Sequence, residues 1–275
     1  MPDLSGRWSR EHIGFDPPLS GTGPIVNRSR LRSGQSNPRQ LVGDYTNPIL
    51  KPQASEIVKQ RAEVGLTTVP APSPSNQCLP MPPPFILQWE QIQVVQQGGQ
   101  ITILYADDHQ VRHIRMNQMH PARLIPSWHG DSIGWFERDT LVVDTIGIKV
   151  GANSMMDWFG TPYSEALHVI ERYWLIDYEA ARQAIQRGEK ENLHLDPNSG
   201  LGYGVAVDPN YKGKALQVQF TVEDNGTLTM PWSATVTYQR PLGDWMEIVC
   251  AENTRRTGAK GDTETSVPTA SKPDF

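Results

Sequence analysis

The alternation of hydrophobic and polar residues changes near residue 85. From there it has a period of two in "FILQWEQIQVVQQ" and "QITILY", and Gly98 and Gly99 between these segments fit a tight turn. Similar segments are "HQVRHIRM", "SIGWFERDTLVVDTIGI", "ALHVIERYWLI", "ALQVQFTVEDNGTLTMPWSATVTYQRP" and "WMEIVCAEN". They predict about eight to ten short strands. Because helices do not alternate with these strands, we expect a mainly β fold, a single antiparallel β-barrel over residues 85–253.

Residues 1–84 lack this alternation. They contain "FDPPLSGTGP" and "PAPSPSNQCLPMPPP", and Pro-rich segments favour extended backbone. One helix is predicted at "QASEIVKQRAEVG", capped by Ser55 and ended by Gly65. We expect an irregular N-terminal arm that wraps the barrel, where it either covers a cavity or contacts a second copy of the chain in a homo-oligomer.

An insertion at residues 178–213 interrupts the strand pattern. Ala180, Ala181, Ala184 and Ile185 follow helical spacing, and Gly188 can end that helix. The rest of the insertion is rich in Gly, Asn, Asp and Pro. It is either a lid at one rim of the barrel or a decoration without a role in binding. The polar residues 254–275 are expected to form a loosely held tail.

Length and charge exclude several classes of protein. The chain has 275 residues, which is long enough to form a full hydrophobic core. Its net charge of −5 does not indicate a strongly basic surface. Arginines near the start are scattered among Pro, Ser and Gly, which disfavours a nucleic-acid groove. No apolar run reaches about 18 residues, so no membrane span is predicted. "MPDLSGRW" has no apolar signal-peptide core, and it fits either a cytosolic start or a Met placed before an exported chain.

The chain has two cysteines, Cys78 and Cys250. The residues alone leave two readings open: two buried free thiols, or one bridge between the Pro-rich arm and the last strand. A bridge would imply an oxidising compartment. Neither cysteine belongs to a CxxC or Cys/His cluster of the kind that binds structural zinc.

The segment "LYADDHQVRHIR" has the spacing of a metal motif. On a helix, His109 and His113 would share one face and bind one metal. The flanking residues predict a strand, however, and residues four apart in a strand are separated by ~13 Å. Two zinc ligands, each ~2 Å from the ion, cannot be that distant. We therefore expect no metal and no cofactor, with a metal or haem protein using His109, His129 or His168 as the alternative.

The same segment is better explained as a β-hairpin. Asp107 and Asp108 form a turn signal. Tyr105 would then end one strand, and Arg112 and His113 would lie on the next. Because neighbouring residues of a strand point to opposite faces, one of these two must face the barrel interior.

The segment "SWHGDSIGW" is a candidate catalytic site. In an extended strand His129 and Asp131 lie ~6.6 Å apart on the same side. A carboxylate beside an imidazole can orient it and increase its basicity, as general acid–base chemistry requires. The alternative is an ordinary strand start with Trp128 packed in the core.

The segment "SEALHVIERYW" alternates between two faces. His168, Arg172 and Trp174 share one face, and either this face or the opposite one lines the interior. Inside, His168 and Arg172 would need partners, which Asp144 or Glu223 would supply. Alternatively, His168 and Arg172 form a structural polar pair, and Asp144 and Glu223 belong to turns.

Sequence motifs of serine hydrolases, P-loop proteins, dinucleotide-binding proteins and zinc proteases are absent. We expect a cofactor-independent acid–base enzyme of the lyase, isomerase, hydratase or hydrolase type. Its substrate would be a small, partly apolar or aromatic molecule held in the barrel cavity. The alternative is a non-catalytic carrier or sensor of a small hydrophobic ligand. The candidate catalytic residues are His129, Asp131, His168, Arg172 and Tyr105; the candidate ligand-binding residues are Trp128, Arg112, His113, Asp144, Trp174 and Trp232.

Several segments resemble a large family of uncharacterised bacterial proteins. The resemblance rests on "PDLSGRW", "CLPMPPP", "ITILYADDHQVRHI", "HPARLIPSWHGDSIGWFERDTLVVDTIGI", "YSEALHVIERY", "FTVEDNGTLTMPW" and "IVCAEN", and departs from the family at the insertion. Members look like lipocalin-like β-barrels and usually carry a signal peptide. The resemblance therefore implies a lipocalin-like barrel, a periplasmic or secreted location and a Cys78–Cys250 bridge. It implies no reaction, and a cytoplasmic location stays open.

Overall fold

A computed structural model describes residues 1–10, 12–37, 40–66, 71–88, 91–189, 193–194, 207–245 and 248–250. The elements in the N-terminal arm are β1 (Gly6–Ser9), β2 (His12–Ile13), α1 (Arg28–Ser33), α2 (Pro52–Gly65) and the 3₁₀ helix η1 (Ser75–Gln77); the 3₁₀ helix η2 (Phe85–Gln88) follows directly after it. The later elements are β3 (Gln91–Gln96), β4 (Gln100–Tyr105), β5 (Val111–Met116), β6 (Asp131–Glu137), β7 (Thr140–Ile146), β8 (His168–Ile176), α3 (Tyr178–Gly188), β9 (Leu193–His194), β10 (Ala215–Glu223) and β11 (Trp232–Tyr238).

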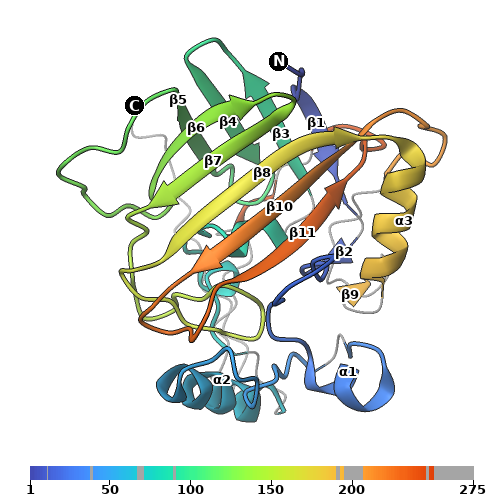
Figure 1. The fold of residues 1–275 in the computed structure, drawn as a ribbon. Helices are drawn as coiled ribbons and strands as arrows, with labels where there is room; N and C mark the ends of the chain where they lie inside the picture. The colour runs from blue at the N-terminus through green and yellow to red at the C-terminus, as the bar shows by residue number, and fades with distance from the viewer. Residues whose placement is uncertain are drawn as a thin grey trace, which may run out of the picture.

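Nine strands form one strongly curved sheet in the order β1-β3-β4-β5-β6-β7-β8-β10-β11 (Figure 1). Its two edge strands meet at one end, where Ser9 N donates to Gln239 O at 2.8 Å and Gln239 N donates to Ser9 O at 2.7 Å. The sheet is therefore a nearly closed barrel, which confirms the mainly β fold predicted from the alternation.

One pair of strands departs from the antiparallel pattern. β5 and β6 are parallel, with Ile114 opposite Ser132 and Met116 opposite Gly134. Parallel neighbours need a crossover connection of a dozen or more residues. Residues 117–130 provide it, and we call this segment the crossover loop.

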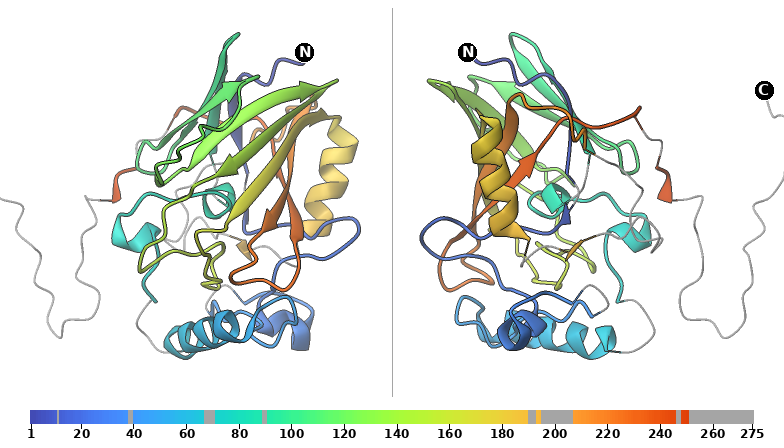
Figure 2. Two further views of the ribbon diagram at one scale, coloured as in Figure 1. Left: turned by 60° about the vertical axis from the view of Figure 1, so that its left-hand side comes forward. Right: turned by 90° about the vertical axis from the view of Figure 1, so that its right-hand side faces the viewer.

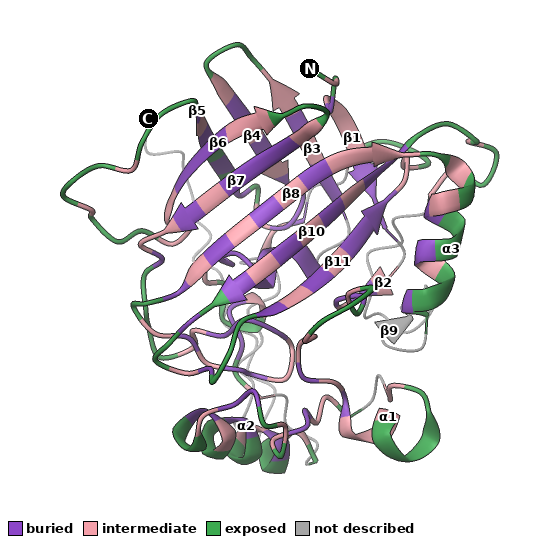
Figure 3. Ribbon diagram, viewed as in Figure 1, coloured by how far each residue is buried: buried purple, intermediate pink, exposed green. Residues whose placement is uncertain are grey.

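Alternation fixes which side chains fill the barrel. On β10, Leu216, Val218, Phe220 and Val222 are buried while the residues between them are partly exposed (Figure 3). Burying each such side chain contributes roughly 1.5–3 kcal/mol. A register slip of one residue would expose this whole set, so the core specifies the register.

The β4–β5 hairpin has the predicted turn. Asp108 and His109 adopt left-handed φ angles of 51° and 49°, which Asp and His tolerate better than most residues. Tyr105 N donates to Gln110 O at 2.9 Å, which closes the hairpin. Beyond the turn Arg112 is buried and His113 is exposed, so Arg112 is the residue that faces the interior.

The arm plugs one end of the barrel and also joins its sheet. Helices α1 and α2 lie below the barrel in Figures 1 and 2, and β1 pairs with β3 in the sheet. Phe15 of the arm packs against Phe220 and Trp232 of the barrel, with ring centroids 4.9 and 5.9 Å apart. Helix α2 begins at Pro52 rather than with a Ser55 cap, because Pro favours the first helical position.

The helix of the insertion was predicted correctly. Asp177 caps α3, with its side chain accepting a hydrogen bond from Ala180 N at 2.8 Å, and α3 ends at Gly188. Ala181 and Ala184 are buried, and α3 contacts β10 and β11. Most of the loop that follows lies outside the described residues, so the alternatives of lid and decoration stay open.

A disulfide joins Cys78 to Cys250, with their Cα atoms 5.4 Å apart. It ties the arm to the β4–β5 turn, because Asp108 Oδ1 accepts a hydrogen bond from Cys250 N at 2.7 Å. The last predicted strand, "WMEIVCAEN", lies partly outside the described residues; Ile248 forms an isolated bridge with Asp107. Within the described part of the chain, no helix has both the length and the apolar character needed to cross a membrane.

Candidate functional site

The predicted site residues are divided between the two faces of the sheet. On β8, Glu171 and Tyr173 point into the barrel and are fully buried, while His168 and Arg172 lie on the outer face and are partly exposed. The sequence had left this choice open. The predicted catalytic set cannot act together, because Tyr105 is inside the barrel and His168 and Arg172 are outside it.

The barrel interior contains a polar network around Arg112. Its guanidinium donates to Ser132 Oγ at 3.1 Å, to Thr145 Oγ1 at 2.6 Å and to Glu171 Oε1 at 2.9 Å, and it also contacts Glu171 Oε2. Tyr173 Oη donates to Glu171 Oε1 at 2.7 Å. Although burial opposes its charge, Glu171 raises the pKa of Arg112 well above the usual value. The two charges are matched and hydrogen-bonded, which is what a stable buried ion pair requires.

Tyr105 and His129 lie beside this network. Their rings are parallel within 2°, with centroids 6.3 Å apart. Burial raises the pKa of Tyr105 to about 12. Burial, together with the Arg112 charge, lowers the pKa of His129 to about 4. Both groups are therefore neutral near pH 7, where His129 is a weak general base and Tyr105 a weak acid.

The predicted pairing of His129 with Asp131 does not occur. Gly130 between them has a left-handed φ of 67° and ends a turn that starts at Ser127. Residues two apart share a side only in extended backbone, so this turn separates the two side chains. Asp131 instead accepts hydrogen bonds from Arg115 at 2.7 and 2.8 Å and lies 2.6 Å from His120 Nδ1.

Asp131 belongs to a chain of acids and imidazoles on the outer face. His120 Nε2 lies 3.4 Å from Asp144 Oδ1, and His168 Nε2 lies 2.8 Å from the same oxygen. His168 Nδ1 is 3.7 Å from Glu223 Oε2, so both acids considered as partners of His168 lie beside it. We call these five residues the acid–imidazole chain. Among the residues the structure describes, no group of three or more His, Cys, Asp or Glu side chains is arranged to hold a metal ion.

The remaining candidates do not share one site. Arg172 pairs with Glu137 at 2.7 Å on the outer face, where Trp174 also lies. His113 is exposed beside Gln100. Trp232 is 1% exposed and belongs to the core. The structure thus places Tyr105 and Arg112 inside the barrel with the partly buried His129 next to Tyr105, and Asp131, Asp144 and His168 outside it. Trp128 packs against Lys149, whose Nζ lies 5.0 Å from the ring centroid.

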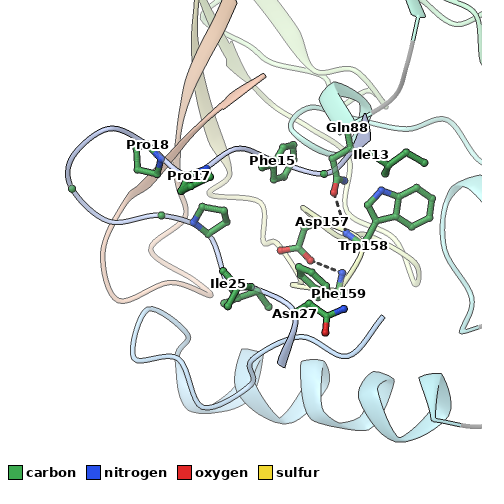
Figure 4. Close-up of a pocket in the computed structure, with 15 residues that line it drawn as sticks. Ile13, Phe15, Pro17, Pro18, Ile25, Asn27, Gln88, Asp157, Trp158 and Phe159 are labelled. Atoms are coloured by element: carbon green, nitrogen blue, oxygen red, sulfur yellow. Dashed lines mark hydrogen bonds between the residues drawn. The ribbon is translucent and has the colours of Figure 1, made fainter. Parts of the chain in front are cut away.

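A pocket of about 200 Å³ lies at the plugged end of the barrel (Figure 4). We call it the arm pocket. Its wall is formed by arm residues between 13 and 27, by Gln88, and by residues 157–159 of the loop between β7 and β8. Its larger side chains are Ile13, Phe15, Pro17, Pro18, Pro24, Ile25, Val26, Asn27, Gln88, Asp157, Trp158 and Phe159.

Asp157 is the charged residue of the arm pocket, and it is 2% exposed. Its Oδ1 accepts hydrogen bonds from Phe159 N at 2.9 Å and from Thr161 N at 3.2 Å. Burial raises the pKa of Asp157, against the opposing effects of Thr161 and the Arg61 charge. In Figure 4 the second carboxylate oxygen is on the side that faces the arm.

Sequence reasoning missed Asp157 and His120. Asp157 is a lone acid in "SMMDWFGTPY", a loop with no catalytic spacing. His120 lies in the crossover loop, where only the tertiary fold brings it next to Asp131. Neither residue belongs to a local pattern, so the sequence carried no signal for them.

Comparison with known proteins gives no match: no family model, no curated protein and no solved structure is significantly similar to this chain. The resemblance inferred from the sequence motifs therefore stays a prediction.

Proposed function

We propose that the protein binds a small, largely apolar molecule in the arm pocket. The observation that carries this proposal is the pocket itself: a hollow of about 200 Å³ walled by Phe15, Ile25, Trp158 and Phe159, with a buried acid at its edge. Small-molecule sites in proteins are typically concave and apolar, with a few polar groups that set orientation and specificity.

The barrel interior is a weaker candidate for the binding site. The side chains of Tyr105, Arg112, Glu171 and Tyr173 fill it, each at most 1% exposed. Arg112 and Glu171 satisfy each other, so a ligand would have to break a buried ion pair to bind them. That loss is costly, because it leaves a charge without a partner in a low-dielectric environment.

A second candidate function is acid–base catalysis at Asp157. Burial raises the pKa of this carboxyl, and a buried acid with a perturbed pKa at a pocket is a candidate for acid–base chemistry. This candidate keeps the expected class of enzyme but moves its chemistry from His129 and His168 to the arm pocket.

We also propose an exported location. Disulfides such as Cys78–Cys250 form and persist mainly in oxidising compartments. The sequence resemblance to the family of lipocalin-like bacterial proteins supports the same proposal, because members of that family usually carry a signal peptide.

Binding is tested with N-phenyl-1-naphthylamine, a fluorescent probe that is uncharged at neutral pH. Ile25→Trp fills the pocket and should reduce binding at least tenfold. The matched control is Leu19→Trp, on the same arm but 82% exposed and outside the pocket wall; it should bind as the unaltered protein does. Circular dichroism checks that both variants fold. Equal binding by a folded Ile25→Trp variant would overturn the proposal.

Catalysis is tested by incubating the protein with a mixed metabolite pool and following it by mass spectrometry. Altered products that disappear with Asp157→Asn favour the enzyme. Retention of an unaltered compound favours the carrier.

A further inference from the structure

The wall of the arm pocket has an unusual charge balance. One acid, Asp157, lines it, and none of the lining residues is Lys, Arg or His. The two amide side chains of the wall are already engaged. Asn27 Nδ2 donates to Gln40 O at 2.9 Å, and Gln88 Oε1 accepts a hydrogen bond from Trp158 N at 3.3 Å. A ligand in the pocket therefore meets one carboxylate and no positive side chain.

The carboxylate has room for another partner. Both backbone hydrogen bonds to Asp157 end on Oδ1, so neither uses Oδ2, although the side chain of Thr161 also interacts with the carboxyl and lowers its pKa. The Arg61 charge acts on Asp157 and lowers its pKa, but among the described residues no ion pair of 4.0 Å or less joins the two; Arg61 Nη2 donates to Pro72 O and lies 3.6 Å from Met155 Sδ. A buried carboxylate gains stability from a cation in direct contact, because little water is present to solvate its charge.

Aromatic rings complete the site. Phe15, Trp158 and Phe159 line the arm pocket; in Figure 4 Phe15 lies above Asp157 and Phe159 below it, while the Trp158 ring lies to its right. Aromatic faces attract cations through their quadrupole, more strongly when the cation is desolvated. The same faces provide apolar area for the uncharged part of a ligand.

We propose that the ligand of the arm pocket carries a protonated amine, held by Asp157 Oδ2 and the surrounding aromatic rings, on a small apolar body. This inference rests on the proposed binding function and names its ligand class. The competing ligand is a neutral alcohol or carbonyl compound that accepts a hydrogen bond from a protonated Asp157. Burial of the carboxyl favours this competitor, whereas the absence of a competing cation in the wall favours the amine.

Three probes of matched shape separate these ligands: 2-phenylethylamine, 2-phenylethanol and phenylacetate. Isothermal titration at pH 7 should show the amine binding about tenfold more tightly than the alcohol, about 1.4 kcal/mol. Phenylacetate should bind at least tenfold more weakly than the alcohol, because its carboxylate would face Asp157. Equal binding of amine and alcohol would overturn the amine assignment.

Asp157→Asn tests the assigned residue. The amide oxygen can keep the backbone hydrogen bonds, so this variant should still bind the alcohol while losing the preference for the amine. The control is Asp139→Asn, an exposed acid in the β6–β7 turn that changes net charge equally and should keep the preference. A preference for the amine that survives in Asp157→Asn would overturn the assignment.

The probes distinguish a wrong ligand class from a wrong binding function. If N-phenyl-1-naphthylamine binds in the arm pocket but the amine has no advantage, the ligand class is wrong and the binding function stands. If neither this probe nor any of the three matched compounds binds, the binding function itself is wrong.

Discussion

Two buried carboxylates, Glu171 in the barrel interior and Asp157 in the arm pocket, differ in what surrounds them. Both are at most 2% exposed. Glu171 contacts a guanidinium and a tyrosine hydroxyl, so its charge is matched inside the protein. Asp157 receives two backbone hydrogen bonds on one oxygen and has no cationic residue in the pocket wall with it. Burial alone does not mark a site: on our proposal, an acid whose charge is matched supports the fold, whereas an acid with one oxygen free of backbone hydrogen bonds beside a pocket receives a ligand.

The largest effect should come from replacing Glu171, and not Asp157, by its amide. Glu171→Gln leaves Arg112 without its counter-charge and should destabilise the protein by about 3–5 kcal/mol. Asp157→Asn keeps its backbone hydrogen bonds and should change stability by about 1 kcal/mol or less, in either direction. Urea unfolding of both variants measures the two values. Similar losses in both would break the comparison.

Removing the disulfide tests how far the stability of the protein depends on the covalent link between the barrel and the arm, which forms most of the pocket wall. Replacing Cys78 and Cys250 by Ser should destabilise the protein by about 2–4 kcal/mol, because the unfolded chain gains freedom. The check is urea unfolding of the double variant beside the oxidised protein. Unfolding midpoints that agree would show that the noncovalent contacts of the arm suffice.

The sequence predicted the barrel better than it predicted the site. Alternation on β8 and β10 fixed the strands, and the turn signal at Asp107 and Asp108 gave the correct hairpin. The parallel pairing of β5 with β6 was missed, because local alternation is the same for either direction of pairing. β1 was missed because four residues are too few to show a period.

The site was harder to predict because it is built from distant segments. The prediction of a His129–Asp131 pair assumed extended backbone through Gly130, and the left-handed turn at that glycine separates the two side chains. Asp157 gains its surroundings from an arm more than a hundred residues earlier in the chain. Such a juxtaposition leaves no spacing signal in one sequence.

A smaller effect should appear in the pH dependence of the acid–imidazole chain. The hydrogen bond with Asp144 raises the pKa of His168, although burial opposes it. Although burial favours its protonated form, His168 and His120 lower the pKa of Asp144. The contribution of His168 to the stability of the fold is complete below the unfolded-state pKa of about 6.5. It is lost as the pH rises through the higher folded-state pKa. The Asp144 contribution is lost as pH falls through its lowered pKa, below about 4.

His168→Gln should therefore cost about 0.5–1 kcal/mol at pH 5.5 and less at pH 9, because both groups are partly exposed. The groups facing this pair are Glu223 on β10 and His120 in the crossover loop. Thermal unfolding at the two pH values measures the difference. A cost that stays constant between them would mean that the pair does not act through charge.

The smallest effect is expected at His129. Its pKa of about 4 keeps the ring neutral, so its nitrogen NMR shifts should stay constant between pH 5.5 and 8. Titration of His129 near pH 6.5 would show that water reaches the interior, and would favour the barrel cavity over the arm pocket.

A crystal structure of the protein with 2-phenylethylamine tests the central claim most directly. We expect density in the arm pocket, with the ammonium group within hydrogen-bond distance of Asp157 Oδ2 and the ring against Phe15 or Trp158. Density inside the barrel, between Tyr105 and His129, with the arm pocket empty would contradict the account.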